Sequence, residues 1–249
     1  MTVRHRGLAI DWFGYATVRI ETPEGFVAYL DPGRYGVLTG EWEPDTPGVG
    51  HPPARDYAPR DGDLVCVTHD HHYDSDAVRR VAGEDATLVV YEAVDAANVS
   101  RDVEPVEGLP YHVERVGYGD EVAFDGVEVR AIPAYNEPDG PHTREGGEPY
   151  HPEGFGCGFV LEIGGATALW PGDSDVLPDQ EAVDATLLLP PIGGSFTMDR
   201  EGAADLAETI APELVLPIHY NTFAALEADS GAFAADVAGR GIPVVLDER

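Results

Sequence analysis

The sequence of 249 residues predicts an α/β protein in which two mixed β-sheets pack face to face with helices on the outside. Two patterns favour this fold. The first thirty residues contain three strand patterns separated by Gly and Pro, and the later part of the chain alternates strand and helix patterns. The hydrophobic fraction of 43% is ordinary for a globular protein, so we expect one domain over residues 1–249.

The opening strand patterns predict an antiparallel meander of LAIDWFG, ATVRIET and GFVAYLD. Residues 40–62 are rich in Pro and acidic residues and lack periodicity, which indicates a long surface loop. The continuous apolar run DLVCVT that follows is typical of a strand covered on both faces. Residues 74–83 then predict a helix, with Asp74 as a candidate N-cap and Gly83 at the C′ position.

Apolar runs and turn residues predict the remaining elements. Strands are expected at TLVVYE, YHVERV, EVAF and VEVRAIPAY, followed by a loop over residues 136–156 that is rich in Gly and Pro. CGFVLEIGG and ATALWPGD predict a hairpin, because Gly-Gly favours a tight turn. The last part predicts a strand at ATLLLPPIGG, a helix from about residue 199, a strand at ELVLPIHY, a helix from about residue 222 and a strand at IPVVLDE.

Charge is the most unusual bulk property of the chain. The sequence has 46 acidic and 15 basic residues, all of the latter Arg, for a formal net charge of −31. Because molar salt screens such self-repulsion, this composition favours a halophilic, cytoplasmic protein. The acidic surface argues against nucleic acid as a partner, which leaves a small-molecule substrate as the expected one.

The compartment is predicted by what the sequence lacks. The N-terminal residues show no signal-peptide pattern, and no window approaches the roughly 20 apolar residues of a membrane span. Cys66 and Cys157 lie in apolar strand patterns and are expected to be buried thiols. These features predict a soluble intracellular protein without a membrane partner.

Side chains that can bind metal follow apolar strand patterns in four separate segments: VCVTHDHHYD, GEPYHPEG, LWPGDSD and VLPIHYN. Strand ends from distant parts of a chain can meet at one sheet edge, so the segments predict a metal site there. The spacing of His69 and His71 lets both imidazoles face one ion from an extended turn. Asp173 is placed to bridge two ions, and His219 follows another strand pattern.

Each candidate also has a purely structural interpretation. Asp74 is a good helix cap, Asp173 a good turn residue, and His72 is free to face solvent. The joint occurrence of four suitable segments favours the metal site over these separate readings. No role is expected for His5, His51 and His112.

The order of these segments resembles the metallo-β-lactamase-fold hydrolases, and among them the branch similar to ascorbate-6-phosphate lactonase. The segments that carry the resemblance cover nearly the whole chain: WFGYATVRIE, YLDPG, THDHHYD, PAYN, HPEGFGCGFVLE, GDSD, LLPPIGGSFTMD and PIHYNTF. The resemblance implies an αββα sandwich, which agrees with the strand patterns.

Carried over by position, the resemblance implies two metal sites. The residues it implies are His69, His71 and His151 for a first ion, Asp173 as the bridge, and Asp74 and His219 for a second ion. Zn or Mn suits such mixed ligands, with one or two ions bound. The implied activity is hydrolysis of an ester, lactone or phosphoester by metal-bound hydroxide, with Asp74 as the proton acceptor.

The sequence departs from the family pattern in two places. The motif His-x-His-x-Asp-His, started at His69, has Tyr73 at the Asp position and Asp74 at the last His position. A frame shifted by one residue gives His72-x-Asp74 the right spacing but loses the first and last His. An insertion of one residue after His71 aligns both His69 and His71 with Asp74 but still lacks the last His. In addition, Asn136 stands in PAYN where some relatives carry His, so His151 is the expected third ligand and His142 its alternative.

These departures keep two other functions open. One is a fold relative with weak or no metal binding that acts as a ligand-binding or protein-binding module. The other is an RNA nuclease, which the acidic composition and the altered motif disfavour. The Gly-Gly turn in PPIGGSF is a further candidate for contact with an anionic substrate, or only a turn.

Overall fold

The structure, a computed structural model, describes residues 1–248 and contains two β-sheets. The first sheet has seven strands in the order β1-β2-β3-β4-β5-β6-β7. Its strands are β1 (Val3–His5), β2 (Leu8–Gly14), β3 (Thr17–Glu21), β4 (Val27–Leu30), β5 (Gly62–Val67), β6 (Ala82–Tyr91) and β7 (His112–Val116). The opening strands pair antiparallel as the meander prediction requires, and β4 to β7 pair parallel.

The second sheet has six strands in the order β13-β12-β11-β10-β9-β8. Its strands are β8 (Glu121–Phe124), β9 (Val127–Ala134), β10 (Gly156–Ile163), β11 (Ala166–Trp170), β12 (Leu187–Leu188) and β13 (Leu214–Val215). The predicted hairpin is β10-β11, and β11, β12 and β13 pair parallel. Both sheets are therefore mixed.

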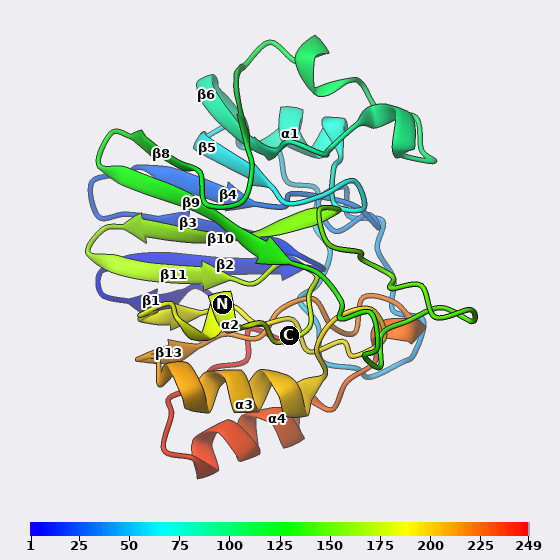
Figure 1. Cartoon of the computed structure of the whole chain (residues 1–249). Helices are drawn as coiled ribbons and strands as arrows, with labels where there is room; N and C mark the ends of the chain where they lie inside the picture. Colours follow the sequence, from blue (N-terminus) through cyan, green and yellow to red (C-terminus); the bar gives the residue numbers. More distant parts are fainter. Residues whose placement is uncertain (249) are drawn as a thin grey trace.

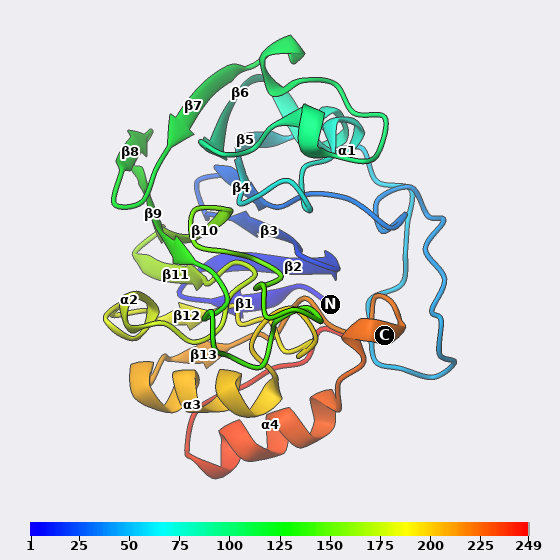
Figure 2. The same ribbon diagram turned by 45° about the vertical axis from the view of Figure 1, so that its right-hand side comes forward.

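Apolar side chains of both sheets form one buried cluster. Trp12 of β2 and Trp170 of β11 are at most 2% exposed and belong to it. Figures 1 and 2 show the two sheets as layers of one sandwich. Burial of so much apolar surface between the layers is what favours this arrangement over two separate sheets. The predicted face-to-face fold is confirmed, whereas the expected single domain over residues 1–249 stays a prediction.

The helices are few and lie at the margins of the sheets. They are α1 (Ser75–Val81), α2 (Pro178–Glu181), α3 (Arg200–Ile210) and α4 (Ser230–Gly239), with 3-10 turns η1 (Ala96–Asn98), η2 (Val106–Gly108) and η3 (Ala224–Leu226). In Figure 1, α1 lies beside β5 and β6, and α3 and α4 lie together near β13. Within residues 1–248, no helix combines the length and apolar composition of a membrane span.

Two local predictions are wrong, and one is confirmed in position only. Gly83 follows the C-cap Ala82 and is the C′ residue of α1, but it is not left-handed, because the chain passes directly into β6. The last helix begins at Ser230 rather than near residue 222, because the side chain of Asn221 binds the backbone N–H of Ala228 and keeps this segment in a turn. The segment IPVVLDE contributes one isolated bridge between Val215 and Val244 in place of a strand.

Candidate metal centre

The four predicted segments meet around the buried carboxylate of Asp173, which follows β11. Its Oδ2 atom is 3.6 Å from Nε2 of His69 and 3.6 Å from Nε2 of His151. Its Oδ1 atom is 3.5 Å from Nε2 of His72 and 3.3 Å from Nε2 of His219. Each oxygen of one carboxylate therefore faces two imidazoles, and these come from distant parts of the chain.

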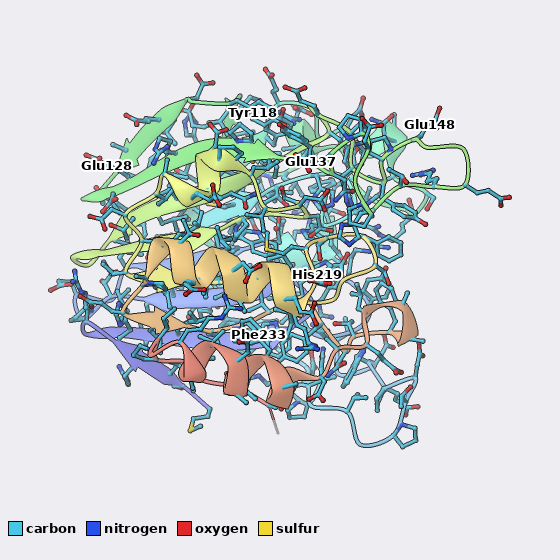
Figure 3. All side chains as sticks on the ribbon, turned by 60° about the horizontal axis from the view of Figure 1, so that its bottom comes forward. Tyr118, Glu128, Glu137, Glu148, His219 and Phe233 are labelled. Atoms are coloured by element: carbon cyan, nitrogen blue, oxygen red, sulfur yellow. The ribbon has the colours of Figure 1, made fainter. Side chains whose placement is uncertain are left out.

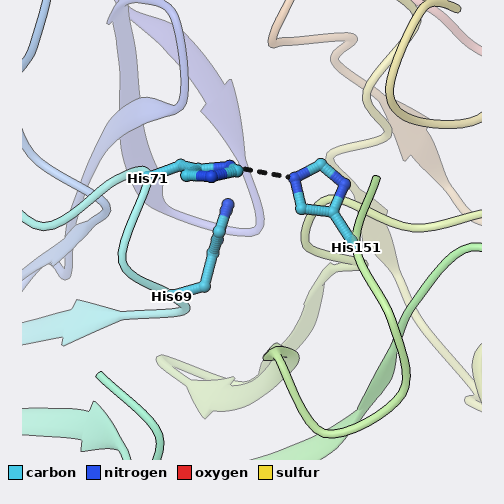
Figure 4. Close-up of side chains that lie close together, drawn as sticks. All are labelled: His69, His71 and His151. Atoms are coloured by element: carbon cyan, nitrogen blue, oxygen red, sulfur yellow. Dashed lines mark hydrogen bonds between the residues drawn. The ribbon is translucent and has the colours of Figure 1, made fainter. Parts of the chain in front are cut away.

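A first group of potential ligands lies on the Oδ2 side of the carboxylate. One ligand atom each of His69, His71 and His151 lies within 4.8 Å of the others (Figure 4). Nδ1 of His71 is 3.2 Å from Nε2 of His151. Two nitrogen ligands of a tetrahedral zinc ion lie about 3.3 Å apart, so these rings are spaced as zinc ligands are.

A second group lies on the Oδ1 side and contains His72, which the sequence did not place. His72 forms a potential site with His69 and Asp173, and its Nε2 atom is 3.2 Å from Nε2 of His219. His72 is 1% exposed, which excludes the interpretation that it faces solvent. The second group therefore contains His72, His219 and the carboxylate of Asp173.

Asp74, expected at the second ion and as proton acceptor, lies at the start of α1. One oxygen of its carboxylate accepts the backbone N–H of Ala77 as an N-cap, and the other accepts the backbone N–H of Arg34. Within residues 1–248, Asp74 is absent from both groups of potential ligands. Asp74 therefore caps α1, and His72 lies beside Asp173, where Asp74 was expected.

The turn after β5 explains why His72 points inward. The backbone N–H groups of His72 and Tyr73 both donate to the carbonyl of His69, at 3.1 and 3.2 Å. This tight turn reverses the chain before α1 begins, so the alternation of an extended strand does not apply. The carbonyl of Thr68 accepts the N–H of Cys157, which ties the turn to β10 of the other sheet.

Asp31, which sequence reasoning missed as a site residue, anchors this turn through hydrogen bonds to Thr68 and His72. Its buried carboxylate accepts the backbone N–H and the hydroxyl of Thr68, at 2.8 and 2.7 Å, and the indole N–H of Trp170 at 2.8 Å. It also lies 2.9 Å from Nδ1 of His72. Burial raises the pKa of Asp31 to about 6, against the lowering effect of the bonds from Thr68 and Trp170. The signal in the sequence was its place in YLDPG, directly after β4.

These hydrogen bonds fix which ring nitrogen carries the proton. We assign the Nδ1 proton of His72 to the bond with Asp31, which leaves its Nε2 lone pair free. Because the hydroxyl of Thr68 donates to Asp31, its oxygen accepts from Nδ1 of His69, 2.9 Å away. Such outer partners orient metal ligands in proteins generally. Nδ1 of His151 donates likewise to the carbonyl of Phe196 at 3.1 Å, outside the cluster.

Asn136, the residue that replaces a family His, positions His151. The backbone N–H of each residue binds the other: Asn136 N–H donates to the His151 carbonyl, and His151 N–H donates to Oδ1 of Asn136, at 2.8 and 2.9 Å. The Nδ2 group of Asn136 donates to Asp175 and to the carbonyl of Phe196. Asn136 thus supports the loop that brings His151 to the cluster.

The other histidines have partners outside the cluster. His142, the alternative third ligand, pairs through Nδ1 with Asp175. The ring of His51 stacks on Trp42 at 3.8 Å. Three histidines for which no site role is expected contact residues outside the cluster through a ring nitrogen: His5 contacts Thr186, His51 contacts Thr222 and His112 contacts Glu114.

Burial sets the charge of the cluster. It lowers the pKa of His71 to about 4 and that of His151 and His219 to about 3, so these rings are neutral near pH 7. Neutral imidazole is the form that binds metal. Burial also raises the pKa of Asp173 well above its usual value. A cation at the cluster would supply the positive charge that this carboxylate otherwise lacks.

Buried polar atoms without hydrogen-bond partners provide a test of metal fit. Within residues 1–248, four such side-chain atoms occur, and two of them face the cluster: Nε2 of His69 and Oδ1 of Asp173. A third, Nδ1 of His219, lies on the side of its ring away from the Nε2 atom that faces Asp173, so an ion at the cluster would not satisfy it. Leaving a buried polar group unpaired costs about 1–3 kcal/mol, and a metal ion satisfies nitrogen and carboxylate lone pairs at once. The donor set fits a divalent transition metal.

Two backbone positions at the cluster adopt the left-handed region. His219 has φ of +57°, a conformation that costs a residue other than glycine of the order of 1 kcal/mol. Gly172, with φ of +74°, precedes Asp173, and a Cβ atom there would lie 2.4 Å from the carbonyl oxygen of Cys157. Glycine therefore lets the chain after β11 pass close to β10 and deliver the carboxylate.

A cleft of about 430 Å³ opens above the cluster. His71, His151, Asp173 and His219 reach its floor; His219 is labelled in Figure 3. The remaining lining residues are aromatic or basic: Tyr15, Arg34, Tyr35, Arg144, Tyr150, Phe196 and Phe223. The cleft thus gives a small molecule access to the cluster, and aromatic rings form part of its walls.

Comparisons with known proteins identify the family of this chain. Residues 9–219 match the model of the beta-lactamase superfamily domain. A UPF0173 metal-dependent hydrolase of Pelotomaculum thermopropionicum is 36% identical over 182 residues, which cover 70% of this chain and 74% of the relative. Another, of Carboxydothermus hydrogenoformans, is 30% identical over 96% of this chain and 95% of its own length.

A solved structure shares the fold. Igni18, a metallo hydrolase of the archaeon Ignicoccus hospitalis, superposes with a TM-score of 0.66 over 97% of this chain and 95% of its own, at 20% identity. The two-sheet fold, the family model and the sequence identity of the relatives lead to one assignment. The chain belongs to the β-lactamase superfamily and, within it, to the UPF0173 metal-dependent hydrolases.

Proposed function

We propose that this protein uses Zn or Mn ions, held on both sides of Asp173, to hydrolyse an ester, a lactone or a phosphoester. The observation that carries the proposal is the buried Asp173 carboxylate, whose two oxygens each face two imidazole nitrogens at 3.3–3.6 Å. A buried carboxylate between two sets of neutral imidazoles is well suited to bridging two cations.

The proposed ligand sets follow from the distances. His69, His71 and His151 would hold a first ion, and His72 and His219 a second. When bound, such ions lower the pKa of water and polarise a carbonyl or phosphoryl oxygen.

The chain itself supplies orientation. Asp31 fixes the ring of His72, and the carbonyl of Phe196 fixes that of His151. Asp74 is not retained as proton acceptor, because both of its oxygens accept backbone N–H groups at the start of α1. The resemblance to the branch of ascorbate-6-phosphate lactonase, a cytoplasmic location and a halophilic origin remain predictions from the sequence.

Metal analysis tests the proposal first. Protein purified without chelator should contain at least one equivalent of transition metal per chain, and up to two. Less than about a tenth of an equivalent, unchanged after incubation with Zn or Mn, contradicts the hydrolase and favours a ligand-binding or protein-binding module.

Hydrolysis is tested next, with a panel of chromogenic esters, lactones and phosphodiesters. His69→Ala should abolish turnover, whereas His112→Ala should not, because His112 is exposed and pairs only with Glu114. Cleavage of RNA without cleavage of any small ester would support the nuclease alternative.

A further inference from the structure

We propose that the cleft selects substrates that carry a negatively charged group, a carboxylate or a phosphate, and that Arg34 and Arg144 bind this group. The inference rests on the proposed hydrolase function and names its substrate class. It is drawn from the side chains that line the cleft above the candidate metal centre.

The first observation is that both arginines lack a carboxylate partner. Within residues 1–248, no carboxylate oxygen lies within 4.0 Å of the guanidinium nitrogens of Arg34 or Arg144. The chain has 46 acidic and only 15 basic residues, so carboxylates are plentiful. Arginines that do form such pairs are Arg6, Arg19, Arg79, Arg80, Arg115, Arg130, Arg200 and Arg240. Within residues 1–248, Arg4, Arg55, Arg60 and Arg101 also form no such pair, but only Arg34 and Arg144 line the cleft, which therefore holds two guanidinium groups available to a ligand.

The second observation is that Arg34 is held in place by its backbone. Arg34 and Tyr35 have φ of +63° and +51°, and their neighbours Asp31 and Gly33 are also left-handed, at +41° and +108°. Residues other than glycine adopt this region only where the surroundings impose it, and such strain is concentrated at functional sites. The backbone N–H of Arg34 donates to Asp74, which anchors the turn to the start of α1.

The side chain of Arg34 is oriented toward the metal cluster. One guanidinium nitrogen donates to the backbone carbonyl of His71, and the group lies 4.5 Å from the ring centroid of Tyr35. Arginine has five N–H donors in a planar fork, so this arrangement leaves donors for a bidentate contact.

Arg144 comes from a separate segment, the loop over residues 136–156, which projects from the body of the protein (Glu148 of this loop is labelled in Figure 3). Its guanidinium group lies 5.6 Å from the ring centroid of Tyr150. Arg34, Arg144 and His71 all line the same cleft. Both guanidinium groups are therefore available to one ligand bound above the cluster.

Aromatic rings complete the cleft. Tyr35 and Phe223 lie 4.8 Å apart, and Tyr150 and Phe196 lie 4.9 Å apart, between ring centroids. These rings offer an apolar surface to the body of a substrate while the arginines take its charged group. Because the net charge of −31 repels anions at long range, short-range contacts of this kind must supply the affinity.

The test compares ligands that share a benzene ring and differ in charge. Benzoate, phenylphosphonate and the neutral benzyl alcohol are titrated calorimetrically into metal-loaded and into chelator-treated protein, at one fixed salt concentration; the phosphonate stands for a phosphate and has no ester bond to hydrolyse. We expect the anions to bind at least tenfold more tightly than benzyl alcohol in both preparations. The preference between benzoate and phenylphosphonate identifies the group as carboxylate or phosphate.

Variants of the two arginines test whether they bind the anion. Arg34→Gln and Arg144→Gln should each weaken binding of the preferred anion by roughly tenfold or more, and Arg144→Lys should restore part of it. Arg55→Gln is the matched control, because Arg55 also stacks on an aromatic ring, at 4.2 Å from the centroid of Phe13, but lines a different pocket. It should bind the anion as the native protein does.

Two results overturn the inference: equal affinity for benzyl alcohol and both anions, or native anion affinity in both Arg→Gln variants. Since Arg34 also contacts His71, circular dichroism and metal content are measured for each variant, and Arg144→Gln decides the case if Arg34→Gln is misfolded. Anion binding in the chelator-treated protein separates this inference from the proposed hydrolysis, which fails instead through absent metal or absent turnover.

Discussion

Replacement of His72 by alanine separates the ligand set in the structure from the one that the family motif implies. Nε2 of His72 lies 3.2 Å from Nε2 of His219 and 3.5 Å from Oδ1 of Asp173. Without it, the second group retains one imidazole and one shared carboxylate oxygen. Loss of a partner that merely orients a ligand weakens metal binding by about 10–100-fold. Loss of the ligand itself should weaken binding of the second ion at least about 100-fold, which corresponds to about 2.7 kcal/mol of binding free energy.

Replacement of Asp74 by alanine should leave metal binding intact and destabilise the fold. Asp74 caps α1 through Ala77 and also accepts the N–H of Arg34. Loss of an N-cap costs about 1 kcal/mol, which in a chain of this length lowers the melting temperature by about 2–4 °C. Asp74→Asn keeps an acceptor at the cap and should lose less stability.

The assay is metal content by mass spectrometry after dialysis, together with competition against a chromogenic chelator and thermal melting. We expect His72→Ala to retain one ion and lose the other, and Asp74→Ala to retain both. His112→Ala, at the exposed first residue of β7, controls for the loss of any histidine. If Asp74→Ala releases an ion while His72→Ala keeps both, the geometric reasoning is refuted and the motif frame that starts at His69 is correct.

Three further perturbations act on the same centre. Asp31→Asn should weaken binding of the second ion by about 10–100-fold, because an amide holds the ring of His72 less firmly than the carboxylate does. Unchanged metal affinity in the chelator competition contradicts this role of Asp31. Gly172→Ala should destabilise the protein by roughly 2–5 kcal/mol in urea unfolding, since it combines a left-handed residue with a clash, whereas Gly165→Ala, left-handed in open space, should cost only about 1–2 kcal/mol. Burial lowers the pKa of the cluster histidines, to about 3 for His151, from an unfolded value of about 6.5. Since the unfolded chain binds these protons first, the unfolding free energy of metal-free protein should fall below about pH 6.5, by up to about 1.4 kcal/mol per pH unit for each such histidine, with the raised pKa of Asp31 offsetting part. A midpoint of urea unfolding that is equal at about pH 7 and pH 5 contradicts this predicted loss of stability.

The strands and most candidate ligands were predictable because their signals are local. Alternating or continuous apolar runs identify strands such as β3 and β5 through side-chain periodicity, which depends only on neighbouring residues. The placement of His69, Asp173 and His219 directly after such runs predicted that they meet at one sheet edge, and the structure brings them together. The segment IPVVLDE shows the limit, because it meets only the two-residue edge strand β13 and forms a single bridge there, to Val215.

What only the tertiary structure decided is which side chains of VTHDHHYDSD face the centre. The turn after β5 is closed by two hydrogen bonds to the carbonyl of His69 and held by Asp31, which is distant in the sequence. That turn brings His72 inward and leaves Asp74 to cap α1. Sequence spacing gives the order of side chains along a segment, but the direction of each depends on hydrogen bonds made by segments that meet only in the folded protein.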